Sequence, residues 1–291
     1  MSDQTTPENT IAFQGQPGAY SHLACREAFP DMAILPCDSF ENVFEAVTQG
    51  RARLAMIPID NSLAGRVADI HHLMPESGLF IVAEHFQRVR HNLLGVPGAA
   101  LAGLKAVHSH VHALGQCRKI IQELGLRAHV HADTAGAARQ VAQDGDASVA
   151  AIASRLAAET YGLAVLRADV EDAGHNTTRF VIMARDETRP APGAGPTMTT
   201  IVFRVRNVPA ALFKAMGGFA TNGVNLTKLE SYMVGGFFDA TQFYADIEGH
   251  PDDANVKLAL EELAFFSHEV RILGTYPADP FRHGGKVDET D

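Results

Sequence analysis

The segment Glu187-Thr188-Arg189-Pro190-Ala191-Pro192-Gly193-Ala194-Gly195-Pro196 decides how this chain of 291 residues is divided. Its proline and glycine residues interrupt both helical and strand periodicity, which is typical of a linker between domains. The parts on either side are each long enough to bury a hydrophobic core. We therefore predict a first domain over residues 10–186, a linker over 187–198 and a second domain over 199–278.

Before the linker, short apolar segments alternate with segments of helical periodicity. This order is typical of βαβ units and predicts an α/β fold with a largely parallel sheet. Ser39 and Asp133-Thr134 each precede an amphipathic run and are predicted to begin helices. The predicted strands are Ile11–Phe13, Met32–Pro36, Leu54–Ile59, Phe80–Glu84, Leu93–Val96, Ala106–Ser109, Ala128–Ala132, Ser148–Ala153 and Phe180–Ala184.

After the linker, the pattern changes to strands that surround two helices. The predicted order is strand Thr200–Arg206, helix Pro209–Asn222, strands Asn225–Val234 and Phe237–Glu248, helix Asp252–Phe265 and strand Val270–Tyr276. A β-α-β-β-α-β order is that of a ferredoxin-like domain.

The composition excludes several classes of protein. Hydrophobic residues make up 46% of the chain, but no apolar run approaches the ~20 residues that a membrane-spanning helix needs. The formal net charge of -10 disfavours nucleic acids and acidic membrane surfaces as partners. The N-terminus is polar and acidic, unlike a secretory signal, so we expect a cytoplasmic protein.

The three cysteines, Cys25, Cys37 and Cys117, are widely spaced. This spacing indicates reduced thiols and suggests neither a disulfide framework nor a zinc cage. His108, His110 and His112 alternate as residues on one face of a strand would, and in principle could share a metal. No Asp, Glu or Cys completes a ligand set nearby. We interpret these histidines as structural or solvated, and we expect no metal or cofactor.

Three polar segments follow or precede predicted strands. Gly15–Ser21 lies between a strand and a helix, where backbone N–H groups can receive an anion. Pro58–Gly65 ends a strand at the sheet edge where α/β proteins bind ligands. Asn176–Phe180 places a hydroxyl beside a guanidinium, a pair suited to a carboxylate. Each segment alone also fits an ordinary structural role: an unliganded turn, a helix cap, or a strand start with a surface arginine.

In this order and spacing, the polar segments resemble the motifs of the prephenate dehydratase family over nearly the whole chain, from Phe13 to about Tyr276. The segments that carry the resemblance are Phe13-Gln14-Gly15 with Tyr20-Ser21, Pro58–Ser62 with Gly65, Ser109-His110 with Ala113-Leu114 and Gln116-Cys117, Asp133-Thr134-Ala135, and Asn176-Thr177-Thr178-Arg179-Phe180. The resemblance implies a catalytic domain of two α/β lobes, like a type II periplasmic binding protein, followed by an ACT regulatory domain. It also implies conversion of prephenate to phenylpyruvate for phenylalanine synthesis.

The resemblance further implies roles for particular residues. Thr178 would be catalytic. From the chemistry of the reaction we expect it to donate a hydrogen bond to the departing hydroxyl and to relay a proton from water or from a nearby carboxylic acid such as Asp60. Arg179 would bind a substrate carboxylate. Further substrate contacts are expected from Tyr20, Ser21, Asn61, Ser62, Ser109, Thr134, Asn176 and Phe180. Phenylalanine is the expected effector, bound between two ACT domains of a homodimer or homotetramer, with contacts from Ala211, Leu212, Asn225, Leu226, Glu230 and Ser231.

Some positions depart from the family pattern. The usual Pro-Ile-Glu-Asn-Ser is Pro58-Ile59-Asp60-Asn61-Ser62 here, and the usual Ser-His-Pro-Gln is Ser109-His110-Val111-His112. In the second domain, Gly-Ala-Leu is Ala210-Ala211-Leu212 and Glu-Ser-Arg-Pro is Glu230-Ser231-Tyr232-Met233. Two alternative functions remain open: arogenate dehydratase, which performs the same elimination on the amino analogue, and a non-catalytic amino-acid sensor.

Overall fold

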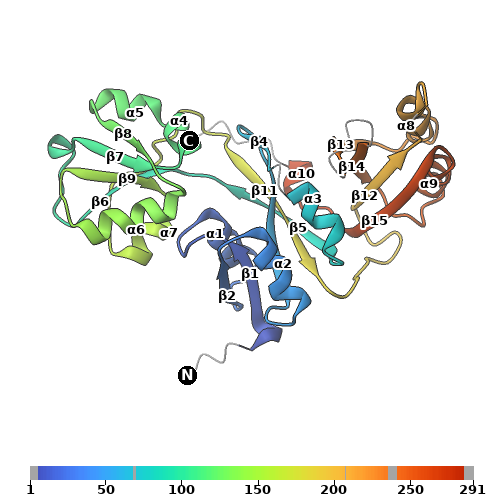
Figure 1. Cartoon of the computed structure of the whole chain (residues 1–291), viewed down its shortest axis with the longest axis horizontal. Helices are drawn as coiled ribbons and strands as arrows, with labels where there is room; N and C mark the ends of the chain where they lie inside the picture. Colours follow the sequence, from blue (N-terminus) through green and yellow to red (C-terminus); the bar gives the residue numbers. More distant parts are fainter. Residues whose placement is uncertain (1–5, 68–69, 207, 235–240, 285–291) are drawn as a thin grey trace. The chain divides into compact units, whose positions relative to one another are not determined.

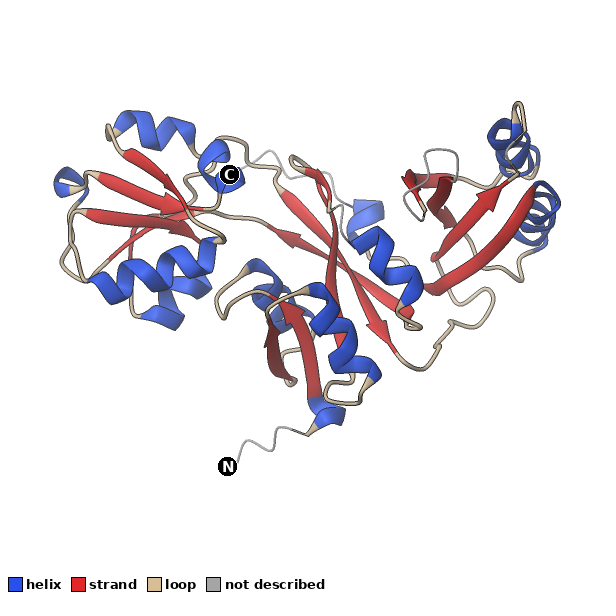
Figure 2. Cartoon of the chain, in the orientation of Figure 1, coloured by secondary structure: helices blue, strands red, loops and turns tan. Residues whose placement is uncertain are grey.

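The computed structural model describes residues 6–67, 70–206, 208–234 and 241–284. The described residues form three sheets with helices beside them (Figures 1 and 2). They group into two compact units, one of residues 6–67 and 85–180, the other of residues 70–84 and 181–284. Among the described residues, no helix has both the length and the apolar character needed to cross a bilayer.

The first sheet has the strand order β2-β1-β3-β11-β5, with the short β4 beside β3. Its strands are β1 (Thr10–Gln14), β2 (Ala33–Cys37), β3 (Leu54–Asn61), β4 (Gly65–Arg66), β5 (Phe80–Arg88) and β11 (Thr177–Ala184). The helices that precede or follow β1 and β2 in the chain are η1 (Pro7–Asn9), α1 (Tyr20–Ala28) and α2 (Phe40–Thr48). Strand β1 pairs in parallel with both β2 and β3. The predicted cap of α2 is confirmed, because Ser39 Oγ accepts from the N–H of Asn42 at 3.3 Å.

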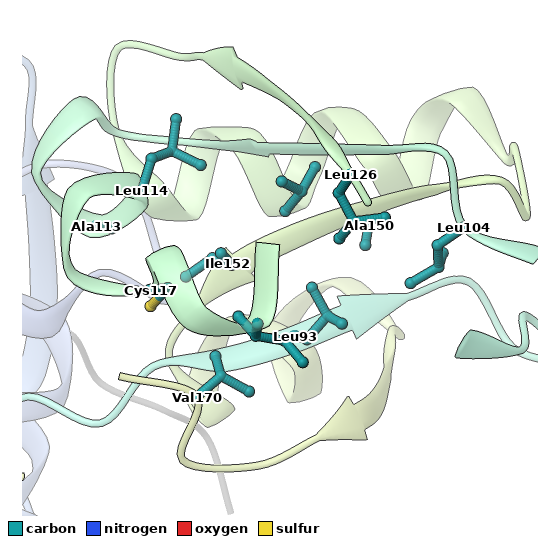
Figure 3. Close-up of a cluster of buried hydrophobic side chains, with 11 residues drawn as sticks. Leu93, Leu104, Ala113, Leu114, Cys117, Leu126, Ala150, Ile152 and Val170 are labelled. Carbon is teal, nitrogen blue, oxygen red and sulfur yellow. The ribbon is translucent and has the colours of Figure 1, made fainter. Parts of the chain in front are cut away.

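The second sheet has the order β10-β6-β9-β7-β8. Its elements are β6 (Asn92–Gly95), η2 (Leu101–Gly103), β7 (Ala106–Ser109), α4 (Val111–Gln116), α5 (Arg118–Glu123), β8 (Arg127–Val130), α6 (Thr134–Asp144), β9 (Val149–Ala153), α7 (Arg155–Tyr161) and β10 (Ala164–Arg167). Apolar side chains from its strands and from α4 and α5 form a buried core that includes Leu93, Cys117 and Ile152 (Figure 3).

The strands of this lobe run partly parallel and partly antiparallel. The predicted parallel arrangement applies to β7, β8 and β9, but β6 pairs antiparallel with both β9 and β10. Within this sheet the chain passes from β6 to β7, on the other side of β9, through residues 96–105. This connection contains the short η2 and lacks the helical crossover that usually joins parallel strands. The three histidines do not share one strand face, because the chain leaves β7 after Ser109 and His110 is the N-cap of α4.

The third sheet confirms the predicted β-α-β-β-α-β order. It has the strand order β13-β14-β12-β15, formed by β12 (Thr197–Val205), β13 (Leu226–Met233), β14 (Thr241–Glu248) and β15 (Ser267–Pro277) with α8 (Ala211–Thr221), α9 (Ala254–Phe266) and α10 (Phe281–Gly284). Its core contains the stacked rings of Phe203 and Phe243, whose centroids are 5.2 Å apart. The start of the strand predicted over Phe237–Glu248 lies outside the described residues.

One helix from the N-terminal half of the chain, α3 (Ile70–Glu76), packs in the same unit as this third sheet. The buried ring of His71 meets that of Tyr244 edge-on at 5.1 Å, and His72 meets Tyr232 in the same way at 5.0 Å. Glu84 of β5 accepts two hydrogen bonds from the guanidinium of Arg282, at 2.6 and 2.8 Å. The second unit is therefore assembled from two separate stretches of the sequence.

Candidate active site

A cavity of about 620 Å³ lies within the first unit and is lined by residues from both of its lobes. The residues that line it are Gln14, Gly15, Gln16, Ala19, Tyr20, Ser21, Asp38, Asn61, Ala64, Gly65, Arg66, Val67, Val89, His91, His110, His112, Ala113, Gln116, Ala132, Asp133, Thr134, Asn176 and Thr178. A cavity of this size, with convergent polar groups from two lobes, is suited to a small polar ligand.

Thr178 and Asn61 stand side by side at the adjacent ends of β11 and β3. Asn61 Nδ2 donates to Thr178 Oγ1 at 3.0 Å, and Asn61 Oδ1 accepts from the backbone N–H groups of Leu63 and Ala64. Because the Thr178 oxygen accepts this bond, its own proton is not used there. No acceptor for that proton is found among the described residues, so the hydroxyl can donate to a bound ligand.

A chain of side-chain hydrogen bonds continues from Asn61 into the second lobe. Asn61 Nδ2 donates to Asn176 Oδ1 at 2.7 Å, and Asn176 Nδ2 donates to Gln116 Oε1 at 2.8 Å. The same Gln116 oxygen lies 2.9 Å from His91 Nε2, and His91 Nδ1 lies 2.8 Å from the hydroxyl of Tyr20. Asn176 and His91 are almost fully buried. This network connects residues that are far apart in the sequence.

Tyr20 and Ser21 follow the loop that joins β1 to α1, and glycines give this loop its shape. Gly18 has φ of +90°, and a Cβ there would lie 2.8 Å from the Cα of Ala157 in α7. The carbonyl oxygen of Gly18 accepts a hydrogen bond from Ser154 Oγ at 2.5 Å. The backbone N–H of Gly18 donates to His22 Nδ1 at 3.0 Å. A left-handed backbone in so close an approach favours glycine. The loop is thereby held against the second lobe.

Three carboxylate or guanidinium side chains line the cavity, those of Asp38, Arg66 and Asp133. Among the described residues that line the cavity, Arg66 of β4 is the only lysine or arginine. Asp133 caps α6 by accepting from the N–H of Gly136 at 2.6 Å, so the N-terminus of α6 and Thr134 also lie at the cavity. A helix N-terminus favours negative charge. Burial, together with the neighbouring His112, lowers the pKa of His110.

Several residues predicted for the site lie elsewhere. Ser109 is fully buried and its hydroxyl donates to the carbonyl of Ile152 at 2.6 Å. Ser62 Oγ donates to the carbonyl of His175 and accepts from the N–H of Thr177, which ties β3 to β11. Neither residue lines the cavity, and Asp60 does not line it either.

Arg179 and Phe180 are also buried outside the cavity lining, at 6% and 1% exposure. Successive side chains of a strand point to opposite faces, so Arg179 of β11 faces away from the side on which Thr178 lies. A substrate carboxylate in the cavity would therefore meet Arg66 before it met Arg179.

The cavity contains functional candidates that the sequence prediction missed. Gln116 and His91 are part of the network described above, and Arg66 lies on a strand of only two residues. Gln116 belongs to the segment that carries the family resemblance, which was the one signal available for it. Nothing in the pattern around His91 or Arg66 pointed to a site.

The predicted effector residues lie on two elements of the second unit. Ala211 and Leu212 begin α8, directly after Ala210, whose φ is +61°. Leu226, Glu230 and Ser231 lie on the edge strand β13, which Asn225 precedes. The Glu230 carboxylate lies 3.4 Å from Lys228 Nζ.

Two α/β lobes that share one cavity define the class of this protein, an α/β protein whose cavity is suited to a small molecule with polar groups. Within that class, the chain belongs to the prephenate dehydratase family, whose model, described as "Prephenate dehydratase", matches residues 11–188. The family includes prephenate and arogenate dehydratases.

Individual relatives agree with this membership. The chain is 58% identical over 276 residues, 94% of its length and 98% of the relative's, to a "Bifunctional N-acyl-homoserine lactone acylase/prephenate dehydratase" of Komagataeibacter europaeus. It is 39% identical to "Arogenate dehydratase/prephenate dehydratase 1, chloroplastic" of Arabidopsis thaliana, covering 97% of this chain and 75% of that one. A prephenate dehydratase from Arthrobacter aurescens, solved in complex with L-Phe, matches with a TM-score of 0.84 and 30% identity, covering 92% and 90% of the two chains.

Proposed function

We propose that the protein is a carbon-oxygen lyase that converts prephenate to phenylpyruvate, carbon dioxide and water. The observation that carries the proposal is the hydrogen bond from Asn61 Nδ2 to Thr178 Oγ1. It leaves the Thr178 proton for the hydroxyl group that departs from the substrate. No cofactor is needed, because aromatisation of the ring drives the reaction.

The proposed reaction balances without a redox partner. The bond between the ring and its carboxylate breaks, and its electron pair completes the aromatic ring as carbon dioxide leaves. The ring carbon–oxygen bond breaks at the same time, and the departing hydroxide takes up a proton to leave as water. Thr178 donates a hydrogen bond to that oxygen where negative charge develops. One proton is taken up from the solvent in each turnover and reaches the departing oxygen through water, so Thr178 contributes a hydrogen bond and no net proton.

The carboxylates of prephenate need cationic or N–H partners in the cavity. We assign one of them to Arg66, whose guanidinium offers paired donors, and the other to the N-terminus of α6 beside Thr134. On this assignment, Arg66→Gln raises KM for prephenate. Arg179→Lys should leave KM unchanged if Arg179 has no contact with the substrate, and a raised KM in that variant would restore the role predicted for it from the sequence.

The central test replaces Thr178 by valine, which has the same shape but no hydroxyl. Loss of a donor that acts in the transition state lowers kcat by about 10²–10³-fold. Thr178→Ser keeps the hydroxyl and is the matched control. Phenylpyruvate is measured by its absorbance in base. Turnover by a folded Thr178→Val protein at nearly the wild-type rate would remove Thr178 from the mechanism, and absence of phenylpyruvate with the wild type would favour a sensor.

Arogenate is the rival substrate, and Asp38 and Asp133 at the cavity are possible partners for its ammonium group. The family's arogenate dehydratases make this comparison necessary. Rates on prephenate and arogenate measured side by side, at equal concentrations, decide which substrate has the higher kcat/KM.

A second activity is suggested by one relative. The 58% identity to the Komagataeibacter europaeus protein extends over nearly the whole of both chains. If this chain shares the acylase activity in that relative's name, water cleaves the amide bond of an N-acyl homoserine lactone and gives a carboxylic acid and homoserine lactone. Testing the wild type and Thr178→Val on this compound shows whether the two activities use the same hydroxyl.

We further propose that the third sheet with α8 and α9 is an ACT regulatory domain, and that phenylalanine binds between the ACT domains of two copies in a homodimer or homotetramer. Support comes from the relative solved with L-Phe. Inhibition requires that phenylalanine bind one state of the enzyme better than the other, by a typical coupling energy of about 1–3 kcal/mol. Activity and molecular mass with and without millimolar phenylalanine test this directly.

A further inference from the structure

The orientation of the Gln116 side chain is determined by its neighbours. Asn61 Oδ1 accepts two backbone N–H groups, so the NH₂ group of Asn61 must face Asn176. Asn176 then presents its oxygen to Asn61 and its own NH₂ group to Gln116, where it donates to Oε1 at 2.8 Å. The oxygen of the Gln116 amide is thus fixed on the side of Asn176.

His91 completes this arrangement. Its Nε2 lies 2.9 Å from the same Gln116 oxygen, so Nε2 must carry the hydrogen of the ring. His91 is 2% exposed, and burial lowers its pKa, so the neutral ring is the expected form. The other nitrogen, Nδ1, is then an acceptor. It lies 2.8 Å from the hydroxyl of Tyr20, which shares its one proton between this nitrogen and the carbonyl oxygen of Arg90, also at 2.8 Å. Burial raises the pKa of Tyr20 well above its usual value, so that hydroxyl keeps its proton.

The consequence concerns the two hydrogens of the Gln116 amide. The oxygen of Gln116 accepts from both Asn176 and His91, whereas its nitrogen has no hydrogen-bond partner among the residues that the structure describes. Gln116 lines the cavity. Its NH₂ group is therefore left for a ligand, and an oxyanion is the group it would bind best.

We propose that His91 is a positioning residue, which holds the Gln116 amide so that its NH₂ group serves as a donor to a substrate oxygen. His91 itself does not touch the substrate in this role. The inference rests on the proposed function, because its effect is measured on prephenate turnover. Without the N–H of His91, Gln116 keeps one of the two bonds that fix its oxygen and can rotate away from the productive orientation.

The test uses two replacements of similar length. His91→Gln can place an N–H at the position of Nε2 and an acceptor near Tyr20, whereas His91→Met fills similar space without a donor. We expect His91→Met to lower kcat/KM about 10-fold, which corresponds to loss of one neutral hydrogen bond. His91→Gln should restore activity to within about 3-fold of the wild type, because it replaces the lost donor.

A double-mutant cycle identifies the route of the effect. If His91 acts through Gln116, His91→Met should lower kcat/KM no further in a Gln116→Leu background. Equal activity of folded His91→Met and His91→Gln, or fully additive losses in the cycle, would overturn the proposal. His250→Leu removes an equally buried histidine from the other unit and controls for a general loss of packing.

These outcomes are separable from failure of the proposed function. If the wild type forms no phenylpyruvate, the proposed function fails, and with it the role of His91. If the wild type is active and Thr178→Val is not, while His91→Met equals His91→Gln, only the role of His91 fails.

Discussion

Gly18 allows a measurement of how firmly the loop before α1 is held against the second lobe. In Gly18→Ala, a residue with a side chain must adopt φ of +90°, which costs about 1–2 kcal/mol. Its Cβ would also lie 2.8 Å from the Cα and 3.1 Å from the Cβ of Ala157. Because helix backbone yields little, this overpacking costs a further ~1–3 kcal/mol. Together the two effects amount to about 2–5 kcal/mol of unfolding free energy.

Gly145→Ala is the matched control, because Gly145 has φ of +67° but a Cβ there meets nothing within 4 Å of the described structure. It should show the backbone cost alone. Urea unfolding followed by circular dichroism gives both values, provided that the m-values agree. The loop leads directly into Tyr20 and Ser21 of α1, so Gly18→Ala should also raise KM for prephenate, whereas Gly145→Ala should not. Equal destabilisation of the two variants would show that the loop is not packed as tightly as described.

Two further predictions concern stability. Glu84→Ala leaves Arg282 without the bidentate carboxylate that it contacts at 2.6 and 2.8 Å, and loss of one partner of a buried pair costs about 3–5 kcal/mol; a change below 1 kcal/mol in the unfolding free energy would contradict this. Burial also lowers the pKa of four histidines from the usual 6.5, namely His22, His91, His108 and His110. Below about pH 6.5 the unfolded chain binds protons that the folded chain does not. The unfolding free energy should therefore be highest above that pH and decrease as the pH falls below it. An unfolding midpoint that stays constant from pH 7.5 to 5.5 would refute this.

The sequence predicted those parts of the fold that depend on local patterns. The caps Ser39 and Asp133 were recognised because a short polar side chain before an amphipathic run satisfies free backbone N–H groups. Strand β4 was missed because its two residues carry no periodicity, and β10 was missed although it is as long as the correctly predicted β7. The end of β7 at Ser109 was predicted correctly, so of the three alternating histidines only His108 lies on that strand.

The candidate site was predicted only in part, because local patterns reveal some of its residues and not others. Asn61, Thr134, Asn176 and Thr178 do line the cavity, as do Tyr20 and Ser21. The strand containing Arg179 was predicted to begin only at Phe180, so the alternation that separates Arg179 from Thr178 was not applied. His91 and Gln116 acquire their proposed roles only through contacts between residues 25 or more positions apart in the chain, which no local pattern reveals.

The packing of α3 against the third sheet limits how this protein can be taken apart. A single cut in the predicted linker would leave residues 70–84 in the N-terminal fragment, although their partners Tyr232, Tyr244 and Arg282 lie in the other fragment. The exposed helix would present the buried Ile70 and Met74 to water. An exchange of the C-terminal domain between relatives must therefore include residues 70–84, and the two units cannot be treated as interchangeable modules joined end to end.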